Sequence, residues 1–255
     1  MLVYELIDNN KEDWVVFIHG FGGSSNTWKK QIDVFSKEYN LLLIDLPGHG
    51  KNSNCIIRKI DTKSLNRDIV ETMDYLNIKK AHFVGLSLGT IVIANFAISN
   101  PSYVKGIIFG GAVLHIQGIY RFVLRLADFI KRFIPYEVMY KLFAWFMMPK
   151  KNHKKSRLIF LREIVKLDKE TTFAWIHYLK ESLSEKNILE KLDNVGKKIL
   201  FVSGSEDHCF LCGSKILADK IKFAKMKIIE HCGHVCTIEK FNIFNNVSLN
   251  YLATI

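Results

Sequence analysis

Residues 81–94 read AHFVGLSLGTIVIA, and the rest of the chain is organised around this stretch. It predicts an apolar strand, a sharp turn at Gly85–Gly89 (GLSLG) and an apolar helix. The pattern G-x-S-x-G is typical of a turn that exposes a serine hydroxyl, because the small glycines let Ser87 occupy a strained bend. At the start of the helix, the backbone N–H of Leu88 is expected to face any oxyanion formed beside Ser87.

Apolar runs that suit buried strands alternate with segments of helical periodicity. Besides the strand before Ser87, strands are expected at residues 1–8, 14–18, 41–44, 104–109, 198–202 and 226–230. Helices between them are expected at about 26–36, 62–76, 213–222 and 238–252. This alternation predicts an α/β fold with a mostly parallel central sheet flanked by helices.

The alternation stops near residue 112, and no strand is expected between 114 and 192. Four helical segments fit there instead, at roughly 117–134, 136–147, 153–167 and 170–184. We therefore predict a core formed by residues 1–111 and 193–255, with residues 112–192 inserted as an all-helical cap over the strand ends.

Chemically useful side chains follow several predicted strands. Ligands of an open parallel sheet bind beyond the carboxyl ends of its strands. The residues expected at those ends are His19-Gly20-Phe21, Asp45, Ser87, Asp207 and His234. They include a serine, an acid and a base in the order Ser, Asp, His. A serine hydroxyl becomes a nucleophile when a histidine takes its proton, so Ser87, Asp207 and His234 are the predicted catalytic residues.

At this point the chain plainly resembles the α/β-hydrolase superfamily, in its serine esterase and lactonase branch with a helical cap. The resemblance covers nearly the whole chain and rests on five marks in one order, which are HGFG at 19–22, DLPGHG at 45–50, GLSLG at 85–89, GSED at 204–207 and GHV at 233–235. It implies that the oxyanion hole pairs the backbone N–H of Leu88 with that of Phe21. Because a serine stands at position 87, the aspartate-dependent dehalogenase and epoxide-hydrolase branches do not fit.

Other residues compete for some of these roles. His231 is an alternative base and Glu206 an alternative acid, although His231 lacks the preceding glycine of the expected turn. Asp45 and His49 are expected to tie their own loop together, and His19 to support its glycine turn.

Five cysteines lie at positions 55, 209, 212, 232 and 236, and an odd number without an export signal favours reduced thiols. The pairs Cys209/Cys212 and Cys232/Cys236, with three histidines nearby, also raise a zinc site, but zinc would compete for His234. We therefore expect no metal and no cofactor.

The cap segment is rich in apolar side chains that suit an acyl pocket. The predicted substrate-binding residues are Phe21, Leu86, Phe143, Phe146 and Met147. The prediction is a serine hydrolase that cleaves a small-molecule carboxylic ester through an acyl-enzyme. An acyl-carrier-linked methyl esterase of the pimeloyl type, a thioesterase and an N-acyl-homoserine lactonase remain alternatives. A non-catalytic binding protein is disfavoured because the three catalytic side chains are all present.

The chain carries a formal net charge of +11 at pH 7. Residues 115–190 hold 15 Lys and Arg against 8 Asp and Glu, so much of the excess lies in the cap. Such a surface suits an acidic acyl carrier protein or an anionic membrane. Nothing resembles a nucleic-acid recognition module. The sequence has no long uncharged run and no visible secretory signal, so a cytoplasmic protein without a transmembrane segment is expected.

Overall fold

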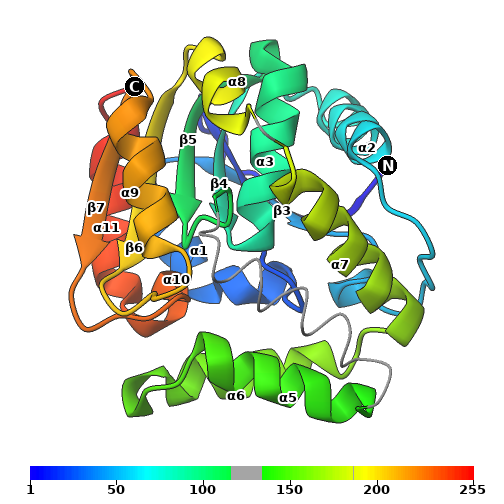
Figure 1. Cartoon of the computed structure of the whole chain (residues 1–255). Helices are drawn as coiled ribbons and strands as arrows, with labels where there is room; N and C mark the ends of the chain where they lie inside the picture. Colours follow the sequence, from blue (N-terminus) through cyan, green and yellow to red (C-terminus); the bar gives the residue numbers. More distant parts are fainter. Residues whose placement is uncertain (116–133, 186) are drawn as a thin grey trace.

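The computed structural model describes residues 1–115, 134–185 and 187–255 of the chain (Figure 1). Its centre is one seven-stranded sheet in the order β1-β3-β2-β4-β5-β6-β7. β1 runs antiparallel to β3, and the other neighbouring strands are parallel. The strands are β1 (Val3–Ile7), β2 (Trp14–Ile18), β3 (Asn40–Asp45), β4 (Ala81–Leu86), β5 (Val104–Gly110), β6 (Lys198–Gly204) and β7 (Ala224–Ile229). The predicted α/β class and mostly parallel sheet are confirmed.

Helices cover both faces of the sheet, because successive side chains of each strand point to opposite faces. Val16 and Ile18 of β2 belong to one apolar cluster, which α2 (Thr62–Tyr75), α3 (Leu88–Ser99), α8 (Ile188–Asn194) and α9 (Leu211–Lys220) complete. Val15 and Phe17 belong to a second cluster with α1 (Lys29–Phe35) and α11 (Phe241–Leu252). The central strands are therefore buried on both faces.

Several helices, α2 among them, form where the apolar spacing predicts them. In α2, Leu65, Ile69 and Met73 are four residues apart and buried. That helix begins where the carboxylate of Asp61 accepts a hydrogen bond from the backbone N–H of Ser64 at 2.9 Å. Shorter 3-10 turns are η1 (Ser25–Trp28), η2 (Gly50–Asn52), η3 (Pro101–Tyr103) and η4 (Lys151–His153).

Part of the predicted cap lies over the carboxyl ends of the strands (Figure 1). α5 (Tyr136–Met147) and α6 (Lys154–Ile164) pack against each other as a separate layer below the sheet in Figure 1. α7 (Lys169–Leu183) lies beside α3. The predicted helix at 117–134 falls almost entirely outside the described residues, so the division into core and cap remains a prediction. Among the described residues, no helix is long and apolar enough to cross a membrane.

Two local features differ from the sequence prediction. α8 was not predicted, and it packs against α3 of the core. The expected closing helix at 238–252 is two helices, α10 (Cys236–Glu239) and α11, because the backbone at Lys240 leaves the helical conformation with φ −133° and ψ 46°.

Candidate active site

Ser87 occupies the sharp turn between β4 and α3, where its backbone has φ 51° and ψ −114°. Such a positive φ is strained for a residue with a side chain. The flanking glycines allow it. A Cβ atom on Gly89 would lie 2.1 Å from the carbonyl oxygen of Ile18, and one on Gly85 would lie 2.9 Å from the carbonyl carbon of Gly89. Larger residues at these positions would push α3 away from the sheet.

Hydrogen bonds satisfy the polar groups of this turn and connect it to β5. The backbone N–H of Ser87 donates to the carbonyl oxygen of Gly110 at 3.0 Å. The hydroxyl of Thr90 donates to the carbonyl oxygen of Ser87 at 2.6 Å and accepts from the backbone N–H of Val113 at 3.1 Å. The turn that presents the Ser87 hydroxyl is thereby tied by hydrogen bonds to β5 and to the segment after it.

A chain of hydrogen bonds joins Ser87, His234 and Asp207. The Oγ atom of Ser87 is 2.8 Å from Nε2 of His234, and Nδ1 of His234 is 2.8 Å from Oδ2 of Asp207. Asp207 and His234 are buried. This arrangement can take a proton from the serine hydroxyl and stabilise the resulting imidazolium. The three residues predicted from the sequence are thus brought together.

Asp207 lies in the loop of residues 205–210, between β6 and α9, and His234 lies in the loop of residues 230–235, between β7 and α10. The backbone N–H of Gly233 donates to Oε2 of Glu239 at 2.6 Å, which holds the turn before His234. Gly111, at φ +52°, allows close approach, since a Cβ there would lie 2.6 Å from the carbonyl oxygen of His234. The ring of Phe210 lies 5.1 Å from that of His234.

The competing residues have other contacts. His231 points outward, with its side chain 85% exposed. The carboxylate of Glu206 accepts hydrogen bonds from Asn152 and His153 and forms an ion pair with Lys150. The side-chain contacts of Glu206 are therefore mainly with the segment of residues 150–153.

The predicted oxyanion hole consists of the backbone amides of Leu88 and Phe21. Leu88 is the first residue of α3, where amides have no acceptor within the helix. Phe21 lies in the turn after β2, and this turn contacts Ser87 closely, because a Cβ on Gly20 would be 3.2 Å from the Cβ of Ser87. Their catalytic role stays a prediction.

Two buried histidines support the turn that carries Phe21. Nε2 of His19 accepts from the backbone N–H of Leu46 at 3.1 Å, and Nε2 of His49 accepts from that of Gly22 at 3.1 Å. Burial lowers the pKa of His19 and holds the pKa of His49 well below its ordinary value. Both rings are therefore neutral and can accept at Nε2.

The carboxylate of Asp45 supports the neighbouring loops. It accepts from the backbone N–H groups of Ser25 at 2.6 Å and Lys51 at 3.0 Å. These contacts agree with structural roles for Asp45, His19 and His49.

The predicted substrate-binding residues lie at different depths. Leu86 and Met147 are buried, Phe21 is half-buried, and Phe143 and Phe146 are each 40% exposed. Phe146 of α5 lies 5.5 Å from the ring of His208, next to Asp207. This contact brings α5 close to the 205–210 loop, whereas the binding role of these five residues remains a prediction.

Sequence reasoning missed side chains that border the same region. Phe160 and Ile164 of α6 face the turn after β2, because a Cβ on Gly22 would lie 3.3 and 3.0 Å from them. They follow the helical period of the cap, but that period alone does not reveal which core residue they contact. The sequence does offer a signal for Phe210 as a residue that borders the site, because it is three residues beyond Asp207.

The five cysteines, all within the described residues, form no disulfide, and Cys209, Cys232 and Cys236 are buried while Cys55 and Cys212 are exposed. Burial raises the pKa of Cys209 to about 12 and raises those of Cys232 and Cys236 as well. Within residues 1–115, 134–185 and 187–255, no group of His, Cys, Asp and Glu is arranged to hold a metal ion.

Comparison with known proteins finds relatives that are named as enzymes. A segment of 113 residues is 34% identical to 2-succinyl-6-hydroxy-2,4-cyclohexadiene-1-carboxylate synthase of Klebsiella pneumoniae, and it spans 44% of either protein. Over 97% of this chain and 90% of the relative, the chain is 25% identical to a 2-hydroxy-6-oxononadienedioate/2-hydroxy-6-oxononatrienedioate hydrolase of Comamonas testosteroni. The match to the first of these relatives therefore covers less than half of its length.

Solved structures share the fold. A carboxylesterase structure from Nitrososphaera gargenis superposes with a TM-score of 0.82 at 20% identity, over 99% of this chain and 94% of the other. The enol-lactonase of Burkholderia xenovorans LB400 superposes with a TM-score of 0.75 at 20% identity, over 99% and 96%. The family model described as alpha/beta hydrolase fold matches residues 13–147, which is more than half of the chain. From this match, the seven-stranded sheet and the serine turn, we conclude that the chain belongs to the alpha/beta hydrolase family.

Proposed function

We propose that this protein is a serine hydrolase that cleaves carboxylic esters through an acyl-enzyme. The observation that carries the proposal is the hydrogen-bonded chain from Ser87 through His234 to Asp207, with Ser87 at a strained turn beside the start of α3. Membership in the alpha/beta hydrolase family supports hydrolysis as the general activity.

The proposed reaction has two halves. His234 takes the proton of Ser87 as Oγ attacks the acyl carbon, and the amides of Leu88 and Phe21 stabilise the oxyanion. When the intermediate collapses, His234 protonates the departing alcohol and the acyl group stays on Ser87. Water then attacks the acyl carbon while His234 takes a proton from the water. When the bond between the acyl carbon and Oγ breaks, His234 returns this proton to Oγ, which releases the acid and restores Ser87.

The proposed substrate is a small acyl ester or lactone, with its acyl group beneath α5 near Phe143, Phe146 and Met147. Phe146 supports this placement because it approaches the loop that carries Asp207. The names of several relatives also support small carbonyl substrates, among them a 3-oxoadipate enol-lactonase of Acinetobacter baylyi, 32% identical over 75 residues and spanning 27% of that protein.

A substrate series tests this proposal. We would measure kcat/KM for p-nitrophenyl esters of two to sixteen carbons, an enol-lactone, an acyl-homoserine lactone, an acyl thioester, and a 2-hydroxy-6-oxo-dienedioate. Ester or lactone turnover that disappears in Ser87→Ala supports the proposal. Turnover that persists in Ser87→Ala contradicts the serine mechanism, and turnover of the dienedioate alone would reassign the reaction to carbon–carbon bond cleavage.

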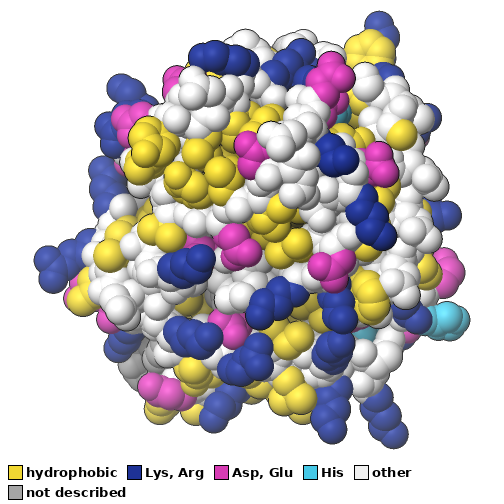
Figure 2. Space-filling view, turned by 180° about the vertical axis from the view of Figure 1, so that it is seen from behind, with side chains coloured by type: hydrophobic (Ala, Val, Ile, Leu, Met, Phe, Trp, Pro, Cys, Tyr) yellow, Lys and Arg dark blue, Asp and Glu magenta, His cyan; other side chains and the backbone are white. Residues whose placement is uncertain are grey.

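A second candidate is hydrolysis of an ester carried by an acidic acyl carrier protein. It is favoured by the charge of residues 136–166, which hold eight Lys and Arg but two Glu. Lys151, Lys154 and Lys155 are exposed at the junction of α5 and α6. Seen from behind, many Lys and Arg side chains gather on the lower part of the molecule, with hydrophobic atoms between them (Figure 2). The sequence also suggests Arg121, Arg125 and Arg132 as contact residues for such a carrier, and these three lie outside the described residues.

Added salt and charge-reversal variants distinguish docking of an acidic carrier from a basic surface that binds no partner. For a carrier-bound substrate, kcat/KM should fall steeply with salt and in the triple variant Lys151→Glu, Lys154→Glu and Lys155→Glu, while that for a p-nitrophenyl ester changes little. The matched control reverses the exposed Lys222, Lys225 and Lys227 at the far edge of the sheet. An equal response to both triple variants would contradict docking at the cap.

A further inference from the structure

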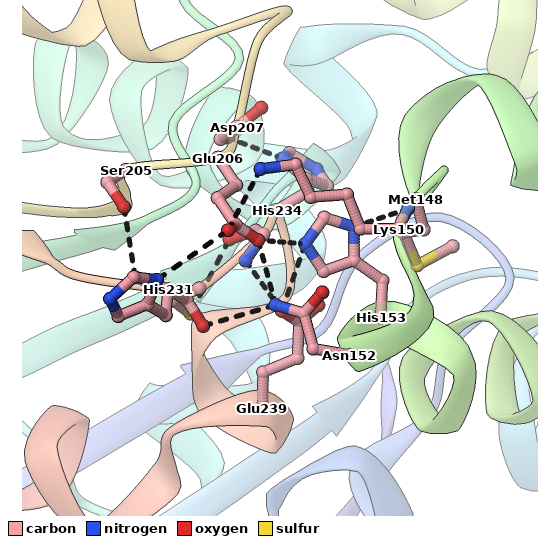
Figure 3. Close-up of polar contacts among 12 residues, drawn as sticks. Met148, Lys150, Asn152, His153, Ser205, Glu206, Asp207, His231, His234 and Glu239 are labelled. Atoms are coloured by element: carbon pink, nitrogen blue, oxygen red, sulfur yellow. Dashed lines mark hydrogen bonds and ion pairs between the residues drawn. The ribbon is translucent and has the colours of Figure 1, made fainter.

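A buried histidine of the cap lies against both loops that carry the proposed acid and base (Figure 3). His153 ends η4, immediately before α6, and is fully buried. Its Nε2 atom is 2.8 Å from Oε2 of Glu206, while its Nδ1 accepts from the backbone N–H of Lys150 at 3.4 Å. The acceptor role of Nδ1 places the ring proton on Nε2, so Nε2–H donates to Glu206.

Through Glu206, the ring contacts the 205–210 loop next to Asp207. Glu206 also meets Nζ of Lys150 at 2.9 Å, Nδ2 of Asn152 at 2.8 Å and, more distantly, Nδ1 of His231 at 4.0 Å. These hydrogen bonds and the lysine charge lower the pKa of Glu206 to about 2, so the carboxylate is ionised at neutral pH. Three of its partners come from the single segment 150–153.

The same ring contacts the 230–235 loop next to His234. A Cβ on Gly233 would lie 2.7 Å from Nε2 of His153, so only a glycine fits between this ring and the turn. Oε2 of Glu239, which holds the N–H of Gly233, is 3.9 Å from Nε2 of His153. In addition, the backbone N–H of Glu206 donates to the carbonyl oxygen of Cys232 at 2.8 Å, which joins the two loops directly.

We propose that His153 is a positioning residue, which uses its contacts with Glu206 and Gly233 to hold Asp207 and His234 in register with Ser87. His153 touches none of the three proposed catalytic side chains in the described contacts, so it acts through their neighbours. The inference rests on the proposed serine mechanism. Because displacements of about 1 Å at reacting groups cost about 10²-fold in rate, loss of this ring should lower kcat rather than weaken substrate binding.

The test compares His153→Leu, His153→Gln and the matched control His177→Leu, at a cap histidine whose side chain is 70% exposed. With a p-nitrophenyl ester, kcat should fall about 10- to 100-fold in His153→Leu, with KM changed less than about twofold. His153→Gln should recover most of kcat, because its amide N–H can still donate to Glu206. The pH profile of kcat/KM should shift in His153→Leu and not in His177→Leu.

Two further measurements keep this inference separate from the proposed function. The rate at which a fluorophosphonate labels Ser87 should fall in parallel with kcat. The low-field proton resonance of His234 Nδ1–H, which needs no substrate, should broaden or move in His153→Leu while circular dichroism shows a folded protein. If this resonance and the labelling rate equal those of the unmodified protein, or if only the melting temperature falls, His153 has no positioning role. Absence of labelling in the unmodified protein would instead contradict the serine mechanism, and the resonance would still decide on His153.

Discussion

The strained backbone of Ser87 and the exposed position of His231, the alternative base, bear on the proposed chemistry at the level of single side chains. Ser87 carries a positive φ that its own turn must support, and His234 is the histidine that reaches its hydroxyl. His231 also has a positive φ, of 52°, but its side chain points to solvent. A positive φ alone therefore does not identify a reacting residue. The hydrogen bond to His234 distinguishes Ser87 from His231.

Removal of any proposed catalytic group should abolish most of the turnover. We expect Ser87→Ala, His234→Ala and Asp207→Asn each to lower kcat by at least about 10³-fold with an unchanged fold. The matched control is His231→Asn, since asparagine tolerates the positive φ, and it should retain nearly full activity. A loss in the control as large as that in His234→Ala would reassign the base. Steady-state kinetics and circular dichroism make the comparison.

The thiols should divide by burial. Cys55 and Cys212 are exposed, whereas burial disfavours the thiolates of Cys209, Cys232 and Cys236. Iodoacetamide at neutral pH should therefore modify the first two in the native protein and all five after unfolding. Peptide mass spectrometry measures the occupancy of each site. Rapid native alkylation at Cys232 would show that the 230–235 loop opens readily.

At the level of elements, the turn between β4 and α3 depends on close contact of a helix with a strand. Gly89→Ala should lower the free energy of unfolding by at least about 2 kcal/mol and lower the proposed ester turnover, because the new Cβ collides with the backbone of β2. In the control Gly106→Ala, the new Cβ meets chiefly the flexible end of Ile255, and the loss should be below about 1 kcal/mol. Urea titration measures both, and equal losses would contradict this account.

Strands and the serine turn could be predicted from the sequence because their signals are local. The apolar runs at 14–18 and 104–109 match β2 and β5 closely. The G-x-S-x-G motif at 85–89 correctly predicted a strand before it and a helix after it. The break at Lys240 and the short helix α8 carry no comparable signal. The pair His153 and Glu206, 53 residues apart, depends on how the segment between α5 and α6 packs against the 205–210 loop, which no local pattern encodes.

For the whole molecule, buried neutral histidines make stability depend on pH. Burial lowers the folded-state pKa values of His19 and His49 and brings that of His82 to about 4. The unfolded chain binds these protons near pH 6.5, so the stability is present above that pH and is lost as pH falls toward the folded values. His82 alone should account for about 3 kcal/mol between pH 6.5 and 4.

Chemical denaturation at a series of pH values measures this dependence. The free energy of unfolding should decline from pH 6.5 to 4, and the decline should be shallower in His82→Asn. The exposed His177 provides the control variant His177→Asn, which should retain the slope of the unmodified protein. If the free energy of unfolding depends on pH equally in all three proteins, His82 does not contribute to this dependence.

The segment 150–153 joins α5 to α6 and also contacts the 205–210 loop and the 230–235 loop. One consequence concerns modular exchange among relatives. In a chimaera whose α5 and α6 come from a relative, Glu206 and Gly233 would lose their contacts with the side chains of residues 150–153. The helical segment could then not be exchanged independently of the loops it packs against. An active chimaera should therefore transfer residues 150–153, 206 and 233 together.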